Sequence, residues 1–278
     1  MNLDGKVTLV TGASRGVGAA TAVALATAGC RVACAARATK HAPQRTPGTL
    51  DDTLDRIRAA GAHAVALPTN LAVEAEVIAM VRRTADHFGG VDVLVNNAAI
   101  TFVGDLEIAM KRHDLVMDVN LRAPFLAMRE AAPLMKRAGE GAIVNLSSMA
   151  ALAPIPGLMS YGVSKLALER LTVDVANQLR GHRIACNVFR IDVPVASEGF
   201  VANTPGADRS DWEPCEVAAE GILWMLRQPP SYSGQLASMW ELRRRHGIMA
   251  SRAARPYRGT PVLALQQGLA GRDQSIFT

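Results

Sequence analysis

The stretch Lys-Val-Thr-Leu-Val-Thr-Gly-Ala-Ser-Arg-Gly-Val-Gly, residues 6–18, decides the fold of this chain. Its first part, residues 6–10, is a short and largely apolar run typical of a buried strand, and the Ala-rich segment after Gly18 is typical of a helix. Between them, Gly12 allows a sharp turn, Gly16 lets backbone amides approach an anion, and Gly18 lets helix and strand pack closely. This order predicts a dinucleotide site with the pyrophosphate at the helix N-terminus, although such a turn also occurs without a ligand.

Short apolar runs recur along the chain and alternate with helix-length segments. Strands that are apolar on both faces indicate a parallel sheet covered by helices on both sides. We therefore predict a doubly wound, three-layer α/β fold of the Rossmann type, in a single domain over residues 1–278. Thr49 and Asp52 predict the start of a short helix that Gly61 ends. The predicted strands are residues 6–10, 31–35, 64–67, 91–95, 142–146, 183–189 and 235–240.

Charge is unevenly distributed along the sequence. The chain has 30 Lys and Arg against 25 Asp and Glu, a net charge of +5, but residues 243–278 contain seven Arg and one acidic residue. The preceding body is therefore close to neutral, and we expect residues 243–278 to form a basic extension without a clear core face. Only 4% of the residues are aromatic, and a near-neutral body with few stacking side chains argues against nucleic-acid binding.

Composition also argues against several other classes of protein. No apolar run approaches the ~20 residues that span a bilayer, so we expect no membrane partner. Because no His or Cys cluster has metal-ligand spacing, we predict no metal site. The N-terminus lacks a signal-peptide pattern, and four irregularly spaced cysteines are too few for a disulfide framework, which together favour a cytoplasmic location.

A second group of polar residues follows the predicted strands in the middle of the chain. Tyr161 and Lys165 stand four residues apart at the start of a helical stretch and therefore lie on one helix face. Taken alone, they would be an ordinary surface pair. Ser148, however, follows the fifth predicted strand, and Asn97 and Ala98 follow the fourth. All of them should therefore meet at the carboxyl edge of the sheet, where α/β proteins place reactive groups.

Asn120 lies inside a predicted helix over residues 114–136, where an Asn usually faces solvent or caps a turn. Pro124 changes this interpretation, because proline has no amide hydrogen to bond the carbonyl of Asn120. We therefore expect the helix to bend there and to leave that carbonyl free to hold a water molecule.

Over residues 2–241 the chain resembles the short-chain dehydrogenase/reductase family. The resemblance is carried by the glycine turn, the Asn-Asn-Ala segment, Asn120, Ser148, Tyr161 and Lys165. The resemblance implies that Tyr161 is the general acid/base and that Lys165 holds the nicotinamide ribose and lowers the tyrosine pKa. It also implies that Ser148 donates to the substrate oxygen and that Asn120 belongs to a proton relay. The Pro-bearing loop and Pro-Gly-Thr segment before the short capped helix most resemble the hydroxysteroid dehydrogenase-like branch.

The choice of cofactor depends on the end of the second strand, where an acidic residue would bind a ribose 2′-hydroxyl. Ala36 occupies that position, Arg37 follows it, and Arg15 offers a second guanidinium. A pair of Arg side chains suits a 2′-phosphate, so NADP(H) is favoured over NAD(H). The residues expected to contact the cofactor are Gly12, Ser14, Arg15, Gly16, Val17, Gly18, Arg37, Asn70, Leu71, Asn97, Ala98, Tyr161, Lys165, Ile191 and Val193.

The sequence departs from the family pattern at three places. Asn70 stands where an Asp commonly contacts adenine, and Ala99 replaces a common Gly. The segment that begins Arg190-Ile191 replaces the usual Pro-Gly, so we expect the backbone of Ile191 and Val193 to hold the nicotinamide end. The leading hypothesis is an NADP(H)-dependent oxidoreductase that interconverts a secondary alcohol and a ketone or aldehyde by hydride transfer. A non-catalytic NADP(H)-sensing or scaffold protein on the same fold is the alternative that these departures leave open.

The expected partners are a small alcohol or carbonyl substrate and a second copy of the chain. Residues 196–212, between the sixth strand and the next helix, should form a lid. The apolar residues Met149, Leu152, Ile155, Met159 and Phe200 suggest an apolar substrate, although ordinary loop packing explains them equally well.

Two predicted helices, residues 114–136 and 163–179, carry apolar residues on more than one face. Because a monomer would expose the surplus, and because the family resemblance implies pairing of these helices, we predict a homodimer or homotetramer. The apolar positions are Leu121, Phe125, Met128, Met135, Leu166, Leu168, Leu171, Val173 and Val175.

Overall fold

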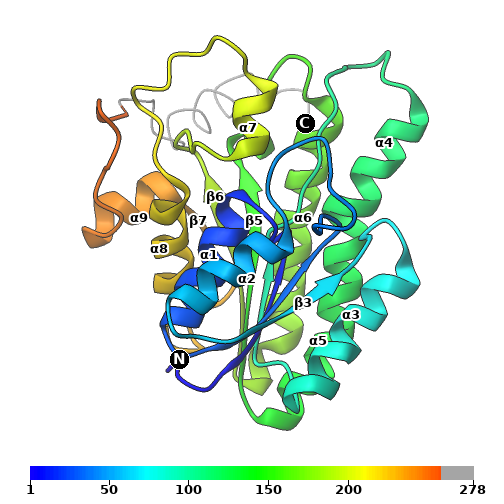
Figure 1. Cartoon of the computed structure of the whole chain (residues 1–278), viewed down its shortest axis with the longest axis vertical. Helices are drawn as coiled ribbons and strands as arrows, with labels where there is room; N and C mark the ends of the chain where they lie inside the picture. The colour runs from blue at the N-terminus through cyan, green and yellow to red at the C-terminus, as the bar shows by residue number, and fades with distance from the viewer. Residues whose placement is uncertain (258–278) are drawn as a thin grey trace, which may run out of the picture.

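One parallel sheet of seven strands forms the centre of the molecule, in the order β3-β2-β1-β4-β5-β6-β7. The structure is a computed structural model that describes residues 1–257 (Figure 1). The predicted Rossmann-type fold is confirmed. The strands are β1 (Val7–Thr11), β2 (Arg31–Ala36), β3 (Ala64–Pro68), β4 (Val93–Asn96), β5 (Gly141–Ser148), β6 (Ile184–Ile191) and β7 (Leu236–Ser238).

Helices cover both faces of this sheet, as Figure 1 shows. One face packs against α1 (Gly16–Thr27), α2 (Leu50–Ala59), α8 (Cys215–Leu226) and α9 (Met239–His246). The other face packs against α3 (Glu74–Phe88), α5 (Ala123–Ala138) and α6 (Met159–Leu179). Two short helices, α4 (Met110–Met117) and α7 (Glu198–Asn203), lie beyond the carboxyl edge of the sheet.

The strand order reverses between β1 and β4, because the chain moves outward to β2 and β3 and then returns to the other side of β1. At such a reversal the loops that follow two neighbouring strands diverge and leave a crevice at the carboxyl edge. The glycine turn follows β1 and the Asn-Asn-Ala segment follows β4, so the fold brings these two predicted site segments together.

The last predicted strand is shorter than expected, and this part of the prediction was wrong. The Ser238 hydroxyl accepts the Glu241 amide at 3.0 Å and so caps α9, which places Met239 and Trp240 in a helix rather than a strand. The prediction that the chain has no core face beyond residue 242 was also wrong, because Met249 is buried. Of the predicted extension, residues 258–278 lie outside the described part.

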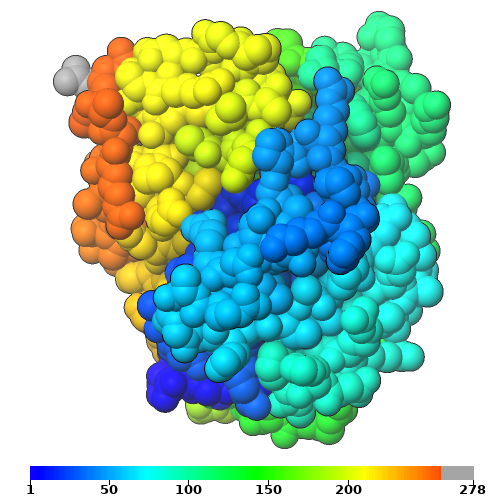
Figure 2. All heavy atoms as spheres, viewed as in Figure 1, coloured from blue at the N-terminus to red at the C-terminus, as the bar shows by residue number. Residues whose placement is uncertain are grey.

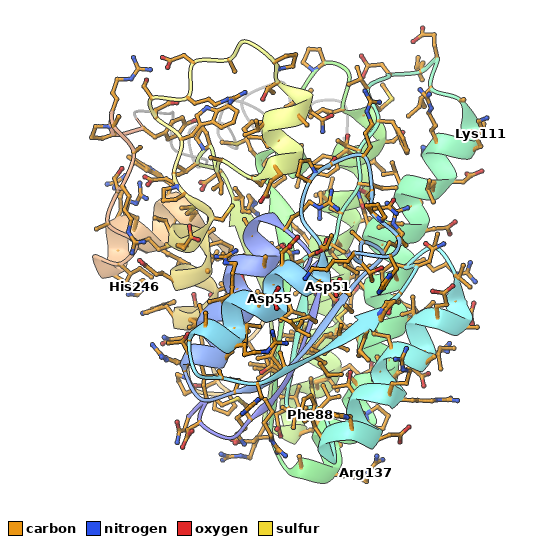
Figure 3. All side chains as sticks on the ribbon, viewed as in Figure 1. Asp51, Asp55, Phe88, Lys111, Arg137 and His246 are labelled. Carbon is orange, nitrogen blue, oxygen red and sulfur yellow. The ribbon has the colours of Figure 1, made fainter. Side chains whose placement is uncertain are left out.

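The loop after β2 is fixed to α2 at several points. Thr49 and Asp52 form the predicted capping box at the start of the helix. The Lys40 amide donates to Asp51 at 2.7 Å, and its ammonium lies 3.3 Å from Asp55 on the same helix (Figure 3). This loop therefore has a defined course beside the end of β2, where the cofactor specificity residues are expected.

None of the helices in residues 1–257 is both long enough and apolar enough to cross a membrane. Within the same residues, no group of three or more His, Cys, Asp and Glu side chains could hold a metal ion. Cys30, Cys34, Cys186 and Cys215 are all free thiols.

Candidate active site

The glycine turn adopts the geometry that its spacing predicts. Gly12 and Gly16 have φ values of +67° and +58°, which side-chain-bearing residues rarely adopt. A Cβ on Gly18 would collide with the side-chain nitrogen of Asn97 and with the Gly12 carbonyl, so only glycine permits this approach. The turn therefore brings the N-terminus of α1 directly to the end of β1, as a phosphate-binding turn requires.

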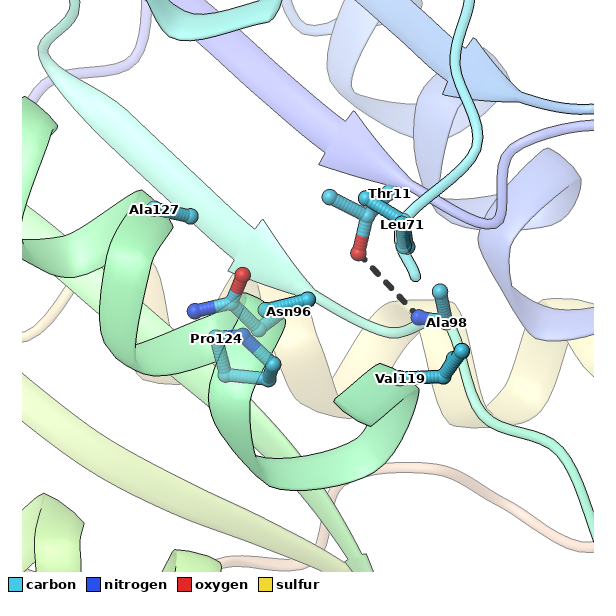
Figure 4. A pocket seen from close by; sticks show the side chains of 8 residues that line it. Thr11, Leu71, Asn96, Ala98, Val119, Pro124 and Ala127 are labelled. Atoms are coloured by element: carbon cyan, nitrogen blue, oxygen red, sulfur yellow. Dashed lines mark hydrogen bonds between the residues drawn. The ribbon is translucent and has the colours of Figure 1, made fainter. Parts of the chain in front are cut away.

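The segment after β4 is attached directly to the end of β1. The amides of Asn97 and Ala98 both donate to the Thr11 hydroxyl at 3.1 Å, and the Asn97 side chain donates to the Thr11 carbonyl at 2.8 Å. Figure 4 shows a narrow hollow next to these contacts, with Leu71 and Ala98 in its wall. Three of the residues expected to contact the cofactor, Asn97, Ala98 and Leu71, are thus close to the strand reversal.

Two guanidinium groups lie near the end of β2. Arg15 donates to the Gly48 carbonyl at 3.0 Å, while Arg37 is exposed. Burial lowers the pKa of Arg15, Glu198 opposes this shift and Arg37 adds to it, so all three charges act on one another. Gly48, with φ of +101°, lies so close to Arg15 that a Cβ there would be 2.8 Å from the Arg15 Cβ. Sequence reasoning did not identify Gly48 as a residue that fixes Arg15.

Ser148, Tyr161 and Lys165 meet where β5 ends and α6 begins. Lys165 is buried, donates to the Leu146 carbonyl of β5 at 2.8 Å, and its nitrogen lies 5.6 Å from the centre of the Tyr161 ring. Tyr161 is half-buried and Ser148 sits at the last position of β5. The spacing of four residues thus places the phenol and the ammonium on the same side of α6, next to the serine.

Burial acts on both titratable groups. It raises the pKa of Tyr161, and the hydrogen bond with Ser148 acts in the opposite direction. Burial lowers the pKa of Lys165 to about 8, with Glu169 acting against this shift. For the chain without cofactor, the raised pKa of Tyr161 is opposite in direction to the lowering that the family resemblance implies, because desolvation disfavours the phenolate.

Asn120 lies in a π-helical turn, η1 (Asp118–Arg122), between α4 and α5. The helical stretch is thus interrupted just before Pro124 by a widened turn. The Asn120 side chain is buried and saturated: it accepts the Ile100 amide at 2.8 Å and donates to the Ile100 carbonyl and to Ser164. Asn120 thereby connects the loop after β4 to Ser164 of α6, the residue before Lys165.

The lid covers the glycine turn. A Cβ on Gly16 would lie 3.1 Å from Ser197 Cβ and 3.5 Å from a Glu198 carboxylate oxygen, so the start of α7 rests on this turn. Within the lid, Phe200 stacks on Trp212 with ring centres 4.6 Å apart. Ser197 caps α7 by accepting the Phe200 amide at 3.3 Å.

The C-terminal arm, residues 247–257, holds the end of the lid. The buried Glu213 carboxylate accepts the Arg243 guanidinium at 2.8 Å and the Arg252 amide at 2.8 Å. The Arg255 amide donates to the Ser210 carbonyl at 2.7 Å. In Figure 2 the yellow lid and the orange arm form one continuous surface. Sequence reasoning missed Glu213, because its partners lie 30 or more residues away.

The remaining predicted site residues have more local roles. The Asn70 carboxamide oxygen accepts the Ala72 amide at 3.2 Å, and Ile191 pairs with Ser148 at the ends of β6 and β5. Val193 is buried. Asp192 is buried and accepts the Trp240 amide at 2.9 Å, which fixes the start of α9.

Comparison with known proteins agrees with this geometry. The family model described as short chain dehydrogenase matches residues 6–193. Hydroxysteroid dehydrogenase-like protein 2 of Xenopus tropicalis is 31% identical over 251 residues, which cover 88% of this chain and 59% of that protein. This chain thus spans little more than half of that relative.

Two solved structures show the same fold over most of the chain. A putative dehydrogenase from Xanthomonas campestris superposes with a TM-score of 0.81 at 29% identity and covers 92% of this chain and 96% of its own. A metagenomic short-chain oxidoreductase in complex with NADP superposes with a TM-score of 0.70 at 30% identity. This match covers 86% of this chain and 99% of that chain. Because the family model extends from β1 through the end of β6 and the same segments form the site, the chain belongs to the short-chain dehydrogenase/reductase family of oxidoreductases.

Proposed function

We propose that this protein is an NADP(H)-dependent oxidoreductase that interconverts a secondary alcohol and a ketone or aldehyde at a Ser148-Tyr161-Lys165 site supported by Asn120. The placement of the Lys165 ammonium 5.6 Å from the Tyr161 ring, beside Ser148, is the observation that carries the proposal. A phenol next to a buried cation and a hydroxyl donor is suited to moving a proton to or from a substrate oxygen.

Each residue of the site has a separate role in this reaction. The Ser148 hydroxyl donates to the substrate oxygen, and Tyr161 transfers the proton. Lys165, whose pKa of about 8 leaves it largely protonated at neutral pH, stabilises the phenolate. Asn120 holds α6 against the loop after β4. NADP(H), when bound, supplies or accepts the hydride.

The glycine turn and the two arginines fit this cofactor. The positive φ of Gly12 and Gly16 and the close packing at Gly18 form the tight strand-to-helix turn that backbone contact with a pyrophosphate requires. Arg15 and Arg37 supply two cations where an acidic side chain would otherwise favour NAD(H). The metagenomic relative was solved in complex with NADP, which supports this choice of cofactor.

An apolar substrate is consistent with the side chains near the mouth of the site. Ile155, Met159 and Phe200 are each exposed, and they come from the loop after β5, the start of α6 and the lid. The similarity to hydroxysteroid dehydrogenase-like protein 2 supports a hydrophobic alcohol or ketone, although this chain spans only 59% of that protein.

The test is a panel of apolar ketones and aldehydes with NADPH, followed by its absorbance, for the wild type and Tyr161→Phe. We expect turnover by the wild type and at least a hundredfold loss in Tyr161→Phe with unchanged NADPH binding, because the variant keeps the ring but loses the proton. Tyr232→Phe is the matched control and should retain activity. A wild type that binds NADPH but turns over no carbonyl would instead favour the sensing or scaffold alternative.

We also propose that the chain acts as a homodimer or homotetramer in the cytoplasm. Phe125 on α5 and Val163 and Leu166 on α6 are roughly half exposed, which supports a partner surface on these helices. Met128, Met135 and Leu168 pack inward, on the face expected to cover the sheet, and add nothing to this surface.

A further inference from the structure

A buried ion pair lies beside Lys165 and takes no part in the proposed proton transfer. Glu169 is one helical turn after Lys165 on α6, and Arg190 stands near the end of β6. The Arg190 guanidinium donates to the two Glu169 oxygens at 2.9 and 2.7 Å. Both side chains are only 3% exposed.

The same carboxylate accepts a third hydrogen bond, from the Ser147 hydroxyl of β5 at 2.6 Å. Partners from β5 and β6 therefore occupy both of its oxygens. A buried carboxylate that lost them would be strongly driven to find another cation. Lys165 lies four residues earlier on the same helix face, which is the spacing at which Lys and Glu form an ion pair.

The surroundings of Lys165 leave two directions open to its ammonium. It now bonds to the Leu146 carbonyl and lies beside the Tyr161 ring. The alternative is the Glu169 carboxylate. The titratable, charged and hydroxyl groups on the elements packed around it include Tyr161 and Glu169 of α6, Ser147 and Ser148 of β5, Arg190 of β6, and His113 of α4, which contacts Ser160.

We propose that Arg190 is a positioning residue: by engaging both oxygens of Glu169, it prevents that carboxylate from pairing with Lys165 and keeps the ammonium directed at Tyr161. This inference rests on the proposed function, in which the phenolate needs that cation. Stability alone does not explain the pair, because a buried ion pair often stabilises a fold no more than apolar residues of the same volume.

The first experiment is the pH dependence of kcat/KM for alcohol oxidation in Arg190→Met. Without Arg190 the free Glu169 carboxylate raises the pKa of Tyr161, and oxidation needs the phenolate, so the acid-side limb should move to higher pH. We expect a shift of about one to two pH units, the size that withdrawing the Lys165 ammonium from its place 5.6 Å from the Tyr161 ring centre produces in an effective dielectric of ~20 to 40.

Two companion variants separate positioning from folding. Arg190→Lys keeps the charge, and the double variant Arg190→Met/Glu169→Gln removes both charges, so both should return the limb to within about half a unit of wild type. If Arg190→Met does not fold, Arg190→Gln takes its place, because it also removes the positive charge and a single amide group cannot engage both Glu169 oxygens as the guanidinium does. An unmoved limb in a folded Arg190→Met or Arg190→Gln, or a double variant that keeps the full shift, would overturn the proposal.

A second readout needs neither substrate nor cofactor. The chain has five lysines, so carbon-13-labelled lysine gives few side-chain resonances, and Lys165→Arg identifies that of Lys165. Its pKa, about 8 in the wild type, should rise in Arg190→Met and return in the double variant. If no carbonyl is turned over, the proposed function fails while this titration still decides whether Arg190 controls Lys165. An unchanged Lys165 titration in Arg190→Met would count against the positioning role.

Discussion

Truncating the chain after Gly247 should destabilise the whole domain, because it removes Met249 from the core. Met249 packs against Gly221 of α8 so closely that a Cβ at Gly221 would collide with its sulfur and with the Phe189 ring. Loss of a buried Met typically costs about 2–5 kcal/mol, and loss of the Arg252 amide from the buried Glu213 about 1.5–3 kcal/mol. Together these are a large part of the ~5–15 kcal/mol that stabilises a typical domain.

The assay is thermal unfolding followed by circular dichroism at a fixed scan rate. At roughly 2–4 °C per kcal/mol for a chain of this size, we expect the melting temperature to fall by about 10–25 °C. Met249→Ala should reproduce the larger part of this fall. Truncation after Tyr257 keeps all of these contacts and is the matched control against which the fall is measured. A Gly247 truncation that melts as high as the full chain would show that the arm does not stabilise the fold.

The other predictions concern the cofactor and the assembly. Arg37→Asp should weaken NADPH binding at least tenfold more than NADH binding, because it replaces a cation beside the expected 2′-phosphate with a repelling charge; equal losses in titrations of both cofactors would mean that Arg37 points elsewhere. Glu198→Gln should tighten NADPH binding about twofold to fivefold, since this exposed carboxylate lies over the glycine turn, whereas Glu216→Gln on α8 should not; no difference between the two in calorimetry would exclude Glu198 as a competing anion. Val163→Asp should halve the mass measured by light scattering, while the exposed Val103→Asp should not; a wild type with the mass of one 29.5 kDa chain would refute the oligomer.

The fold was predictable because its strongest signals are local. The glycine turn, the apolar strands and the capping box at Thr49 each specify their structure within a few residues. The end of β7 was predicted poorly for a related reason: residues 235–240 are apolar enough for a strand, but the Ser238 hydroxyl starts a helix there. A single capping hydrogen bond thus outweighed the apolar pattern.

The parts of the site that sequence reasoning missed depend on contacts between distant segments. Arg190 and Glu169 are 21 residues apart, and Arg15 and Gly48 are 33 apart. Neither pair has a periodic pattern, and each becomes visible only when neighbouring elements pack. Helix faces posed a similar difficulty, because α5 places Phe125 outward and Met128 inward, and only the packing against α3 and the sheet shows which side is buried.

The two loops on the side of the site opposite the lid are joined to each other. Both oxygens of Asp105 accept the Gly157 amide at 3.0 Å, and the Gly104 amide donates to the Gly157 carbonyl at 2.9 Å. The loop before α4 and the loop after β5 must therefore move as one unit if they move at all. A wider entrance for a bulkier substrate would then require changes in the lid. Selection for a new substrate should therefore favour changes in residues 196–212 and leave the joined loops intact.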